Sequence, residues 1–472
     1  MSNLPLKRIS YVALLMVALT GSASAQVANT LRTPTPSGSM GEDSLVVAPP
    51  PKRGDIAALE VATLNLMVWA FGHYVLDGYW TQISLETMDL NLRHGFEWDG
   101  NQFKNNFSSH PYHGNTYFNA ARTNGMNFWE SAPYAFGGSL TWELFMESEF
   151  PSWGDLVMTT IGGVSLGEMF YRYSEQLLDD RTGGWERFWR ELGGAALNPV
   201  GGFNRLVRGD MFKRQGAANH IRNPFRGYIA WGTRSRFNTA DAGKVQVNPS
   251  FALTVGYGDA FEQKASRIPY DYFTFRMWYS KGVSKSNVSM LQYGVLAGRN
   301  HEKADGRISH LLGLFQHFDY VNIDSAFNFG GVTLAPALVS RWINNDTWRL
   351  QTGVHLGWLI LGGSNNEYFT NSQGRNYNYT TGFKSRLNLG VHHRVVGNFL
   401  VDYMYYWMTS VSEIEGKDFI HQFIATYNKK LYKGLGLGLE YYWYNRTGDY
   451  PDLPSPNQTV NGPRILITYG FY

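Results

Sequence analysis

The last half of the chain alternates between apolar and polar residues in twelve successive stretches that run to its final residues. In the stretch 348–358, Trp348, Val354 and Trp358 share one side, whereas Arg349 and His355 share the other. Successive side chains of a β-strand point to opposite faces, so each stretch predicts a strand with one apolar and one polar surface. A soluble sandwich and a membrane barrel both use this pattern.

Composition separates these two cases. Aromatic residues make up 15% of the chain, and 51 glycines accompany them, which is typical of strands that face lipid. A membrane-spanning helix needs ~20 apolar residues, and the best candidate, 61–76, contains Asn65 and His73. We therefore expect a mixed fold with a C-terminal antiparallel transmembrane β-barrel, lipid outside and water inside.

Twelve strands are the best count, and ten to fourteen are acceptable. The expected strands are 228–238, 245–257, 271–281, 287–299, 307–321, 327–343, 348–361, 377–394, 399–410, 420–432, 435–446 and 462–472. Bacterial barrels have short periplasmic turns and longer external loops. With a periplasmic C-terminus, the short connections 433–434, 395–398 and 344–347 fall in the periplasm and the long ones 445–461 and 364–376 outside, whereas 258–270 is long for a periplasmic turn.

The charged residues of these strands nearly all fall on the face assigned to the lumen. The lumen-lining candidates are Arg276, Arg349, His355, Lys384, Arg386, His392 and Arg394. Histidines and arginines in wet barrels are usually solvated lining, and this is the interpretation we favour for them.

The N-terminus predicts an exported protein. Lys7 and Arg8 precede an apolar stretch, and Ala23-Ser24-Ala25 offers a cleavage site, as in a secretory signal. We expect a signal peptide over 1–25, a Pro/Ser-rich linker over 26–53, a helical domain over 54–222 and the barrel over 223–472. The chain has no cysteine, which excludes disulfides and a lipidated cysteine.

Partners follow from the charge balance and from the last strand. Without the signal, 39 of the 41 Lys and Arg residues remain against 38 Asp and Glu, which gives no electrostatic case for nucleic acid. We expect outer-membrane lipid as a partner, together with the barrel-insertion machinery, through the strand that ends Phe471-Tyr472. Its apolar register ends at Phe471, one residue earlier than in the usual export signal. The oligomeric state stays open.

Helical spacing marks the domain before the barrel. The expected helices are 56–76 with Asp55 as N-cap, 139–149, 152–178 with an interruption at Gly162-Gly163, and 185–196. The segment 98–136 is rich in Asn, Gly, His and aromatic residues and is too irregular to assign. We expect this domain to plug the lumen or to cap it from the periplasm.

The same region carries the most distinctive motifs of the chain. They are His110-Pro111-Tyr112-His113-Gly114-Asn115, Ala121-Arg122-Thr123-Asn124-Gly125, Ser139-Leu140-Thr141-Trp142-Glu143, Pro151-Ser152-Trp153-Gly154-Asp155, Thr160-Ile161-Gly162-Gly163, and Gly167-Glu168 through Arg172. With these motifs, residues 95–205 resemble the bacterial family of unknown function DUF3943. The resemblance implies an exported helical segment followed by a β-rich membrane region, and it implies no activity.

Two histidines could ligate a metal, but the sequence favours another role. Pro111 argues against one regular helix that presents both His110 and His113, and no Cys or adjacent Asp/Glu cluster completes a site. We favour histidines packed in an aromatic loop, and we expect neither a metal nor a cofactor.

The carboxylates allow two interpretations. Glu143 and Asp155 could do acid–base work in a pocket with Glu168 and Arg172. Alternatively, Ser152 and Asp155 form a capping box and Glu168 pairs with Arg172 four residues on. We favour the structural interpretation. The catalytic candidates are His110, His113, Arg122, Glu143, Asp155, Glu168 and Arg172.

Three function classes remain. The first and preferred is an outer-membrane barrel with a structural or transport-associated role, whose helical domain gates or closes the pore. The second is a barrel-borne hydrolase or transferase acting on envelope lipid or glycan. The third is a periplasmic interaction module anchored by the barrel. Enzymatic activity is left open, with a non-enzyme preferred, because no nucleophile elbow, zinc-protease motif or P-loop is present.

Overall fold

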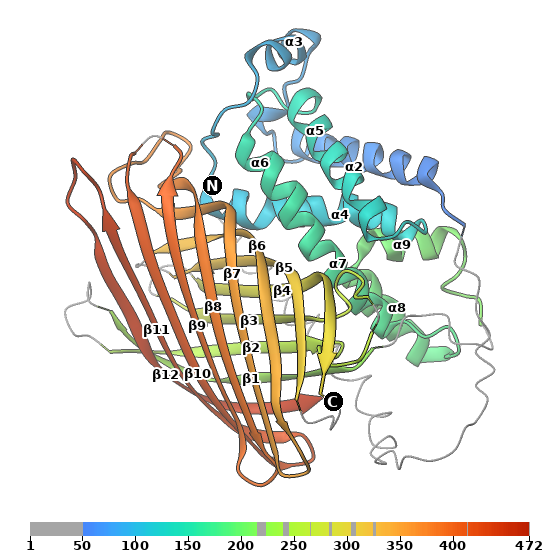
Figure 1. Ribbon diagram of the computed structural model, residues 1–472. Helices are drawn as coiled ribbons and strands as arrows, with labels where there is room; N and C mark the ends of the chain where they lie inside the picture. Colours follow the sequence, from blue (N-terminus) through green and yellow to red (C-terminus); the bar gives the residue numbers. More distant parts are fainter. Residues whose placement is uncertain are drawn as a thin grey trace.

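A computed structural model describes residues 51–214, 223–238, 245–264, 266–282, 286–303, 308–323, 327–412 and 414–471. Figure 1 shows a group of helices beside a barrel of tilted strands. The predicted signal peptide, most of the linker and the terminal Tyr472 lie outside the described residues.

The barrel closes through strand 12 pairing with strand 1. Its elements are β1 (Phe225–Asn238), β2 (Gln246–Tyr257), β3 (Phe273–Lys281), β4 (Ser286–Glu302), β5 (Ser309–Asn322), β6 (Asn328–Asn344), β7 (Trp348–Asn365), β8 (Tyr377–His393), β9 (Gly397–Ser410), β10 (Lys417–Tyr432), β11 (Leu435–Asp449) and β12 (Asn457–Phe471). Each strand pairs antiparallel with its sequence neighbours, and β1 pairs with β12. The predicted twelve-stranded antiparallel barrel is confirmed, and every predicted strand overlaps an observed one.

Contacts across the barrel identify its inner face. Arg276 on β3 reaches Thr426 on β10 at 3.2 Å, and Lys384 on β8 reaches His317 on β5 at 3.0 Å. In each strand, the residues that alternate with these inward-facing ones therefore point outward. On β11, β12 and β1 the outward-facing residues are half-exposed apolar side chains such as Leu439. This outward apolar band is what a transmembrane barrel presents to lipid.

The connections divide between two rims. At the rim that holds the C-terminus, β10 and β11 are joined by residues 433–434 and β8 and β9 by 394–396, whereas the opposite rim carries the longer connections 366–376 and 450–456. The predicted alternation therefore holds. The exception, 258–272, is long because it contacts the helices: Tyr270 hydroxyl lies 2.8 Å from Ser165 Oγ, and Arg172 donates to Pro269 O at 2.7 Å.

The helical part is more regular than the sequence predicts. Its elements are α2 (Gly54–Tyr74), η2 (Tyr79–Thr81), α3 (Leu85–His94), η3 (Asn105–Ser109), α4 (His110–Thr123), α5 (Phe128–Phe145), α6 (Trp153–Val157), η4 (Met158–Gly162), α7 (Gly163–Leu177), α8 (Gly184–Leu197) and α9 (Pro199–Val207). The segment predicted as irregular holds α4 and the start of α5. At the predicted interruption, the π-helix η4 joins α6 to α7 without a break. Asp55 lies in the first turn of α2, whose N-cap is Arg53.

The helices pack against the outer face of the barrel wall. Ser165 on α7 donates to Gln292 on β4 at 2.6 Å, Gln316 on β5 donates to Ile161 O at 2.8 Å, and Phe103 stacks on Tyr320 of β5. These barrel residues have the parity opposite to His317 and Arg276, which face the lumen. Figure 1 agrees, with α4, α6 and α7 lying alongside β4–β7.

The prediction that the helical domain plugs the lumen is therefore wrong for the described residues. Under the helices, the outer face of the barrel wall carries glutamine side chains. Lipid could not form hydrogen bonds with these side chains, whereas groups of the helices do. The covered patch is fully buried on both sides of the wall, as Phe318, Val332 and Tyr377 on its outer face are 0% exposed. The contacts extend from the C-terminal rim at Phe273 to the opposite rim at Tyr377, so the helices do not simply cap one end either.

One helix of the domain is long and apolar enough to cross a membrane by length and composition. This helix is α2, whose apolar window is 22% buried. Its outward residues include Leu59, Met67 and Phe71, which are 55–66% exposed. The two polar residues of this helix have partners within the helical domain: Asn65 is buried and donates to Gly138 O at 3.2 Å, and His73 lies against Thr81.

Candidate functional site

A π-helical turn places His110 at the edge of the helical bundle. η3 runs directly into α4, so His110 begins α4 and Pro111 lies in its first turn. Because η3 continues into α4, Pro111 lies within a continuous helix, and the π-helical turn before it accommodates a residue that has no backbone N–H. The expectation that Pro111 keeps His110 and His113 off one helix is therefore wrong: both lie on α4.

Two further helices bring carboxylates to His110. Glu143 lies in the last turn of α5 and is 1% exposed, and Asp155 lies in α6 and is 2% exposed. Ser152 caps α6 by accepting from Asp155 N at 3.1 Å. The predicted reciprocal bond of a capping box is absent, because Ser152 N donates to Glu143 Oε2 at 2.8 Å instead. Asp155 is thereby free of a capping role.

Close helix packing supports this arrangement. α4 has 14 residues and crosses the η4–α7 segment at Gly114 and Gly163. A Cβ at Gly114 would lie 1.7 Å from Thr159 O, and a Cβ at Gly163 would lie 2.6 Å from Gly114. Only glycine permits the two helices to approach so closely. The close packing places Thr159 next to His110.

His110, Glu143 and Asp155 converge on one point. One ligand atom from each lies within 4.8 Å of the others, and His110 Nε2 is 3.5 Å from Asp155 Oδ2. Glu143 Oε1 and Asp155 Oδ1 are buried without a hydrogen-bond partner. None of the lysines and arginines that the structure describes forms an ion pair with either carboxylate. The arrangement can bind a cation or transfer a proton.

Asp99 connects the cluster of His110, Glu143 and Asp155 to a strand of the barrel. A short parallel bridge between Glu97 and Ser152 brings Asp99 beside the cluster, and Ser152 Oγ donates to Asp99 Oδ1 at 2.9 Å. Asp99 also accepts from the hydroxyl of Tyr379 on the outer face of β8 and from Asn106 at 3.0 Å. Although burial alone would raise it, these hydrogen bonds hold the pKa of Asp99 below its ordinary value.

Burial dominates the electrostatics of the three converging residues. It raises the pKa of Glu143 well above the ordinary carboxyl range, and the charge of Glu147 adds to the rise. Burial and the charge of Asp99 likewise raise the pKa of Asp155. Burial also lowers the pKa of His110 to about 4, against the opposing charge of Asp99. The imidazole is therefore neutral at neutral pH, and it supplies no positive charge to the two acidic groups.

The other catalytic candidates lie apart from this cluster. Glu168, 0% exposed, accepts from Arg122 at 2.6 Å and from Arg172 at 2.8 Å. The two ion pairs share one carboxylate, and the pair with Arg122 ties α4 to α7. This is the structural role favoured for Glu168 and Arg172. His113 lies between Tyr117 and Trp142, with ring centroids 4.5 and 5.4 Å away.

Most of the lumen-lining candidates lie on the inner face. Arg276, His355, Lys384 and Arg386 are buried there, whereas Arg349 and His392 have inner-face parity near the C-terminal rim. Arg394 follows the end of β8. The buried ones are not solvated lining: they form ion pairs and hydrogen bonds across the barrel.

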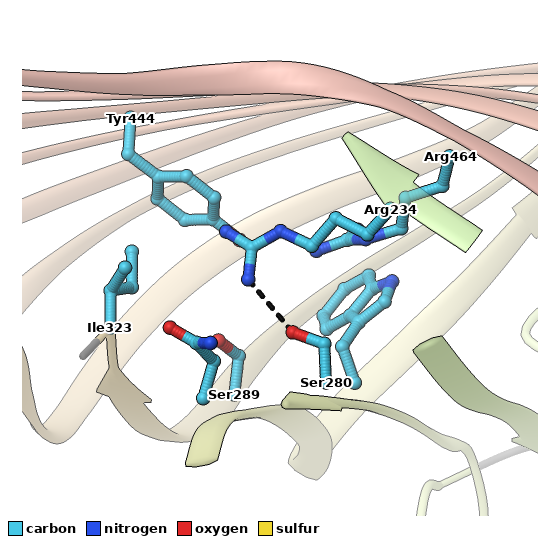
Figure 2. A pocket seen from close by; sticks show the side chains of 8 residues that line it. Arg234, Ser280, Ser289, Ile323, Tyr444 and Arg464 are labelled. Atoms are coloured by element: carbon cyan, nitrogen blue, oxygen red, sulfur yellow. Dashed lines mark hydrogen bonds between the residues drawn. The ribbon is translucent and has the colours of Figure 1, made fainter. Parts of the chain in front are cut away.

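Ion pairs cross the lumen at mid-height. Arg276 lies 3.7 Å from Asp402 and 3.5 Å from Glu440, and Glu440 also pairs with Arg464. Beside them, Arg234 donates to Ser280 Oγ at 2.9 Å. Figure 2 shows Arg234, Ser280 and Arg464 beside a space of about 10 Å³, which is room for about one water.

A wider vestibule lies on the C-terminal side of this crossing. Its volume is about 440 Å³, and Tyr228, Asn398 and Thr468 form part of its wall. Arg276, Arg386 and Asp402 also line it, and because they belong to the crossing network they form its floor.

Sequence reasoning missed three parts of the converging site. Asp99 and Thr159 gave no motif of their own, and Tyr379 belongs to a strand whose outer face was assigned to lipid. The one available signal was in Tyr377-Asn378-Tyr379, where two tyrosines share the outer face at a rim. Such a pair also suits an aromatic girdle, so the sequence offered no means of choosing.

Comparison with known proteins agrees with this organisation. Residues 95–200 match the family model of a domain of unknown function, DUF3943, which confirms the resemblance drawn from the motifs. The matched segment contains His110, Glu143 and Asp155. No curated protein matches the chain.

Several solved structures are similar over the barrel. KdgM porin is 14% identical over 52% of this chain and 99% of its own, with a TM-score of 0.22. The outer-membrane channel DcaP of Acinetobacter baumannii is 10% identical over 52% and 96%, with a TM-score of 0.24. The translocator domain of the autotransporter NalP from Neisseria meningitidis is 11% identical over 58% and 95%, with a TM-score of 0.25. Likeness at these scores carries no argument about function.

Proposed function

We propose that this chain is a non-conducting outer-membrane barrel whose role is to hold the helical domain against its lipid-facing wall. The observation that carries the proposal is the division of the wall into two faces. The inner face closes the lumen with ion pairs, and the outer face of β3–β8 binds the helices.

The outward apolar residues support placement in the outer membrane. Side chains such as Leu439, Ile465 and Trp358 are 53–60% exposed on the parts of the wall that the helices leave bare. An exposed apolar band of this kind costs free energy in water and none in lipid. A transport role would need a path through the lumen, and the crossing network occupies it.

Conductance in planar bilayers tests this function. We expect no steady current from the full-length chain, because Arg276, Asp402 and Glu440 meet across the lumen. The triple variant Arg276→Ala, Arg386→Ala and Asp402→Ala removes the floor of the vestibule and should conduct. Asn398→Ala, on the vestibule wall, is the matched control and should stay silent. Steady single-channel currents from the unaltered chain would contradict the proposal.

A second candidate function is a hydrolase or transferase that acts on an envelope lipid. The specific observation in its favour is the convergence of His110, Glu143 and Asp155 beside the lipid-facing wall. In lipid vesicles, this candidate predicts turnover of bilayer lipid that falls at least about 100-fold in Glu143→Gln. Absence of turnover in vesicles of outer-membrane lipid would remove it.

A further inference from the structure

We propose that His110, Glu143 and Asp155 bind one divalent transition-metal cation, Zn²⁺ or Mn²⁺, where the helices meet the barrel. The inference does not depend on whether the barrel conducts or whether the protein is an enzyme. It goes beyond the sequence interpretation, which expected no metal because neighbouring carboxylates were lacking along the chain. The fold supplies them from α5 and α6.

The distances suit a shared ion. Bonds of about 2.0–2.2 Å from a metal to imidazole nitrogen and carboxylate oxygen place two ligand atoms of one ion about 3.0–3.5 Å apart. His110 Nε2 and Asp155 Oδ2 are already 3.5 Å apart. All three donor atoms lie within 4.8 Å of one another, so Glu143 needs only a small side-chain rotation to complete the set.

The unsatisfied oxygens point to a missing cation. Glu143 uses Oε2 to accept from Ser152 N, and its Oε1 accepts from no donor among the described residues. Its other close neighbour is the carboxyl of Glu147, which supplies no positive charge. Asp155 Oδ1 is also buried without a partner. A buried carboxylate without a counter-charge or hydrogen bond is costly, and folded proteins rarely keep one without a reason. A divalent cation at this point compensates both carboxylates together.

Neighbouring groups hold the donors in position. His110 Nδ1 lies 3.3 Å from Thr159 Oγ1, and donation from Nδ1–H to this hydroxyl leaves the Nε2 lone pair for the metal. Ser152 fixes Glu143 through its backbone N–H and connects to Asp99 through its hydroxyl. Such outer contacts orient the ligands in protein metal sites.

The donor set selects the class of metal. One imidazole nitrogen with two carboxylate oxygens suits Zn²⁺, Mn²⁺ and similar ions better than Ca²⁺ or Mg²⁺, which prefer oxygen alone. Three protein ligands also leave a position for water or for a substrate oxygen, as in catalytic rather than structural zinc sites.

Metal content of the purified full-length chain tests the site. The protein, refolded in detergent, is stripped with chelator, dialysed against Zn²⁺ or Mn²⁺ in turn, and measured by mass spectrometry of the metal. We expect about one ion per chain, and at least a tenfold weaker affinity in Glu143→Gln and Asp155→Asn. Glu149→Gln is the matched control: this carboxylate accepts from Tyr79 and Gln373 outside the cluster, so the variant should bind like the unaltered chain.

A second measurement does not depend on any variant. Co²⁺ bound by nitrogen and oxygen donors absorbs visible light, and we expect the unaltered chain to develop this band and lose it when Zn²⁺ is added. Folding of each variant is checked by the heat-dependent gel mobility of the barrel. Two results would overturn the proposal: less than about 0.1 ion per unaltered chain, or equal binding by the folded triad variants.

Discussion

Two clusters of buried carboxylates, one in the lumen and one among the helices outside the barrel wall, differ in their counter-charges. Inside the lumen, Asp402 and Glu440 are each within 4.0 Å of an arginine. Under the helices on the outer face, Glu143 and Asp155 lie buried with no lysine or arginine among the described residues to balance them. The lumenal ion pairs between arginines and carboxylates fill the inside of the barrel. The two carboxyl groups of the helix cluster have no such counter-charge, and a bound cation would supply one. This difference is the reason for which we propose a structural role for the lumenal ion pairs and a bound cation at the helix cluster.

The largest expected effect comes from breaking the balance in the lumen. Glu440→Gln leaves Arg464 and Arg276 short of a counter-charge, and loss of one partner of a buried pair costs about 3–5 kcal/mol. We expect the free energy of unfolding, measured with urea in lipid vesicles, to fall by that amount. The outer-face counterpart Glu143→Gln removes an unbalanced charge, so the metal-free protein should keep or gain stability. Equal losses in the two variants would remove the contrast between the faces.

A smaller effect is expected where the barrel joins the outer site. Tyr379→Phe removes the hydroxyl that donates to Asp99 and leaves the ring stacked on Trp98, 4.7 Å away. Removal of a direct partner of a ligand weakens metal affinity about 10–100-fold. Tyr379 contacts Asp99, which reaches Glu143 only through Ser152, so we expect a loss of less than about tenfold. Titration with Zn²⁺ should show this loss. Tyr377→Phe, on the same face, is the control and should change affinity less. If both variants bind as the unaltered chain does, the barrel has no part in the site.

The smallest effect concerns pH in the metal-free protein. The pKa of Glu143 is raised by burial, so its protonation favours the folded state. This contribution is complete below the ordinary carboxyl pKa of about 4 and is lost as the pH rises toward the raised value. The stability of the unaltered chain relative to Glu143→Gln should therefore fall above pH 4, by at most about 1.4 kcal/mol per pH unit.

The sign of this pH effect has an internal control. The pKa of Asp99 is lowered, so its contribution is present above the ordinary carboxyl pKa and is lost as the pH falls. The stability of the unaltered chain relative to Asp99→Asn should change in the opposite direction. The change for Asp99→Asn falls below the ordinary carboxyl pKa of about 4, so denaturation with chelator present is measured from about pH 2 to pH 8 to follow both variants. The same sign in both variants would contradict the electrostatic description of the site.

The sequence predicts the barrel well because strand periodicity is a local signal. Alternation in the stretch 348–358 assigns every residue to its observed face, and the short connections give the rims. The helices were harder: the Asn- and Gly-rich α4 forms because Gly114 and Gly163 permit close packing, which is a tertiary effect. The ion pair between Glu168 and Arg172 could be predicted because the two residues are four positions apart on one helix. The contribution of Arg122 could not, because Arg122 lies on another helix.

The site itself could be predicted only as a set of candidates. His110, Glu143 and Asp155 carried the right chemistry, but they lie on three helices, and no spacing rule joins 110 to 143. The side of the wall on which they lie depends on the outward residues Gln292 and Gln316. Their parity was readable from the sequence, but their helix partners were not.

Introduced cysteine pairs test most directly whether the helices lie on the outer face of the barrel. Because the chain contains no cysteine, any cross-link formed by a short thiol-specific reagent comes from the introduced pair. Ser165→Cys with Gln292→Cys should cross-link in the folded protein, because these side chains meet outside the wall at 2.6 Å. Ser165→Cys with Tyr293→Cys should not, because Tyr293 faces the lumen, where its ring lies 4.5 Å from Arg386. Cross-linking of the second pair in place of the first would place the helices inside the barrel and contradict this account.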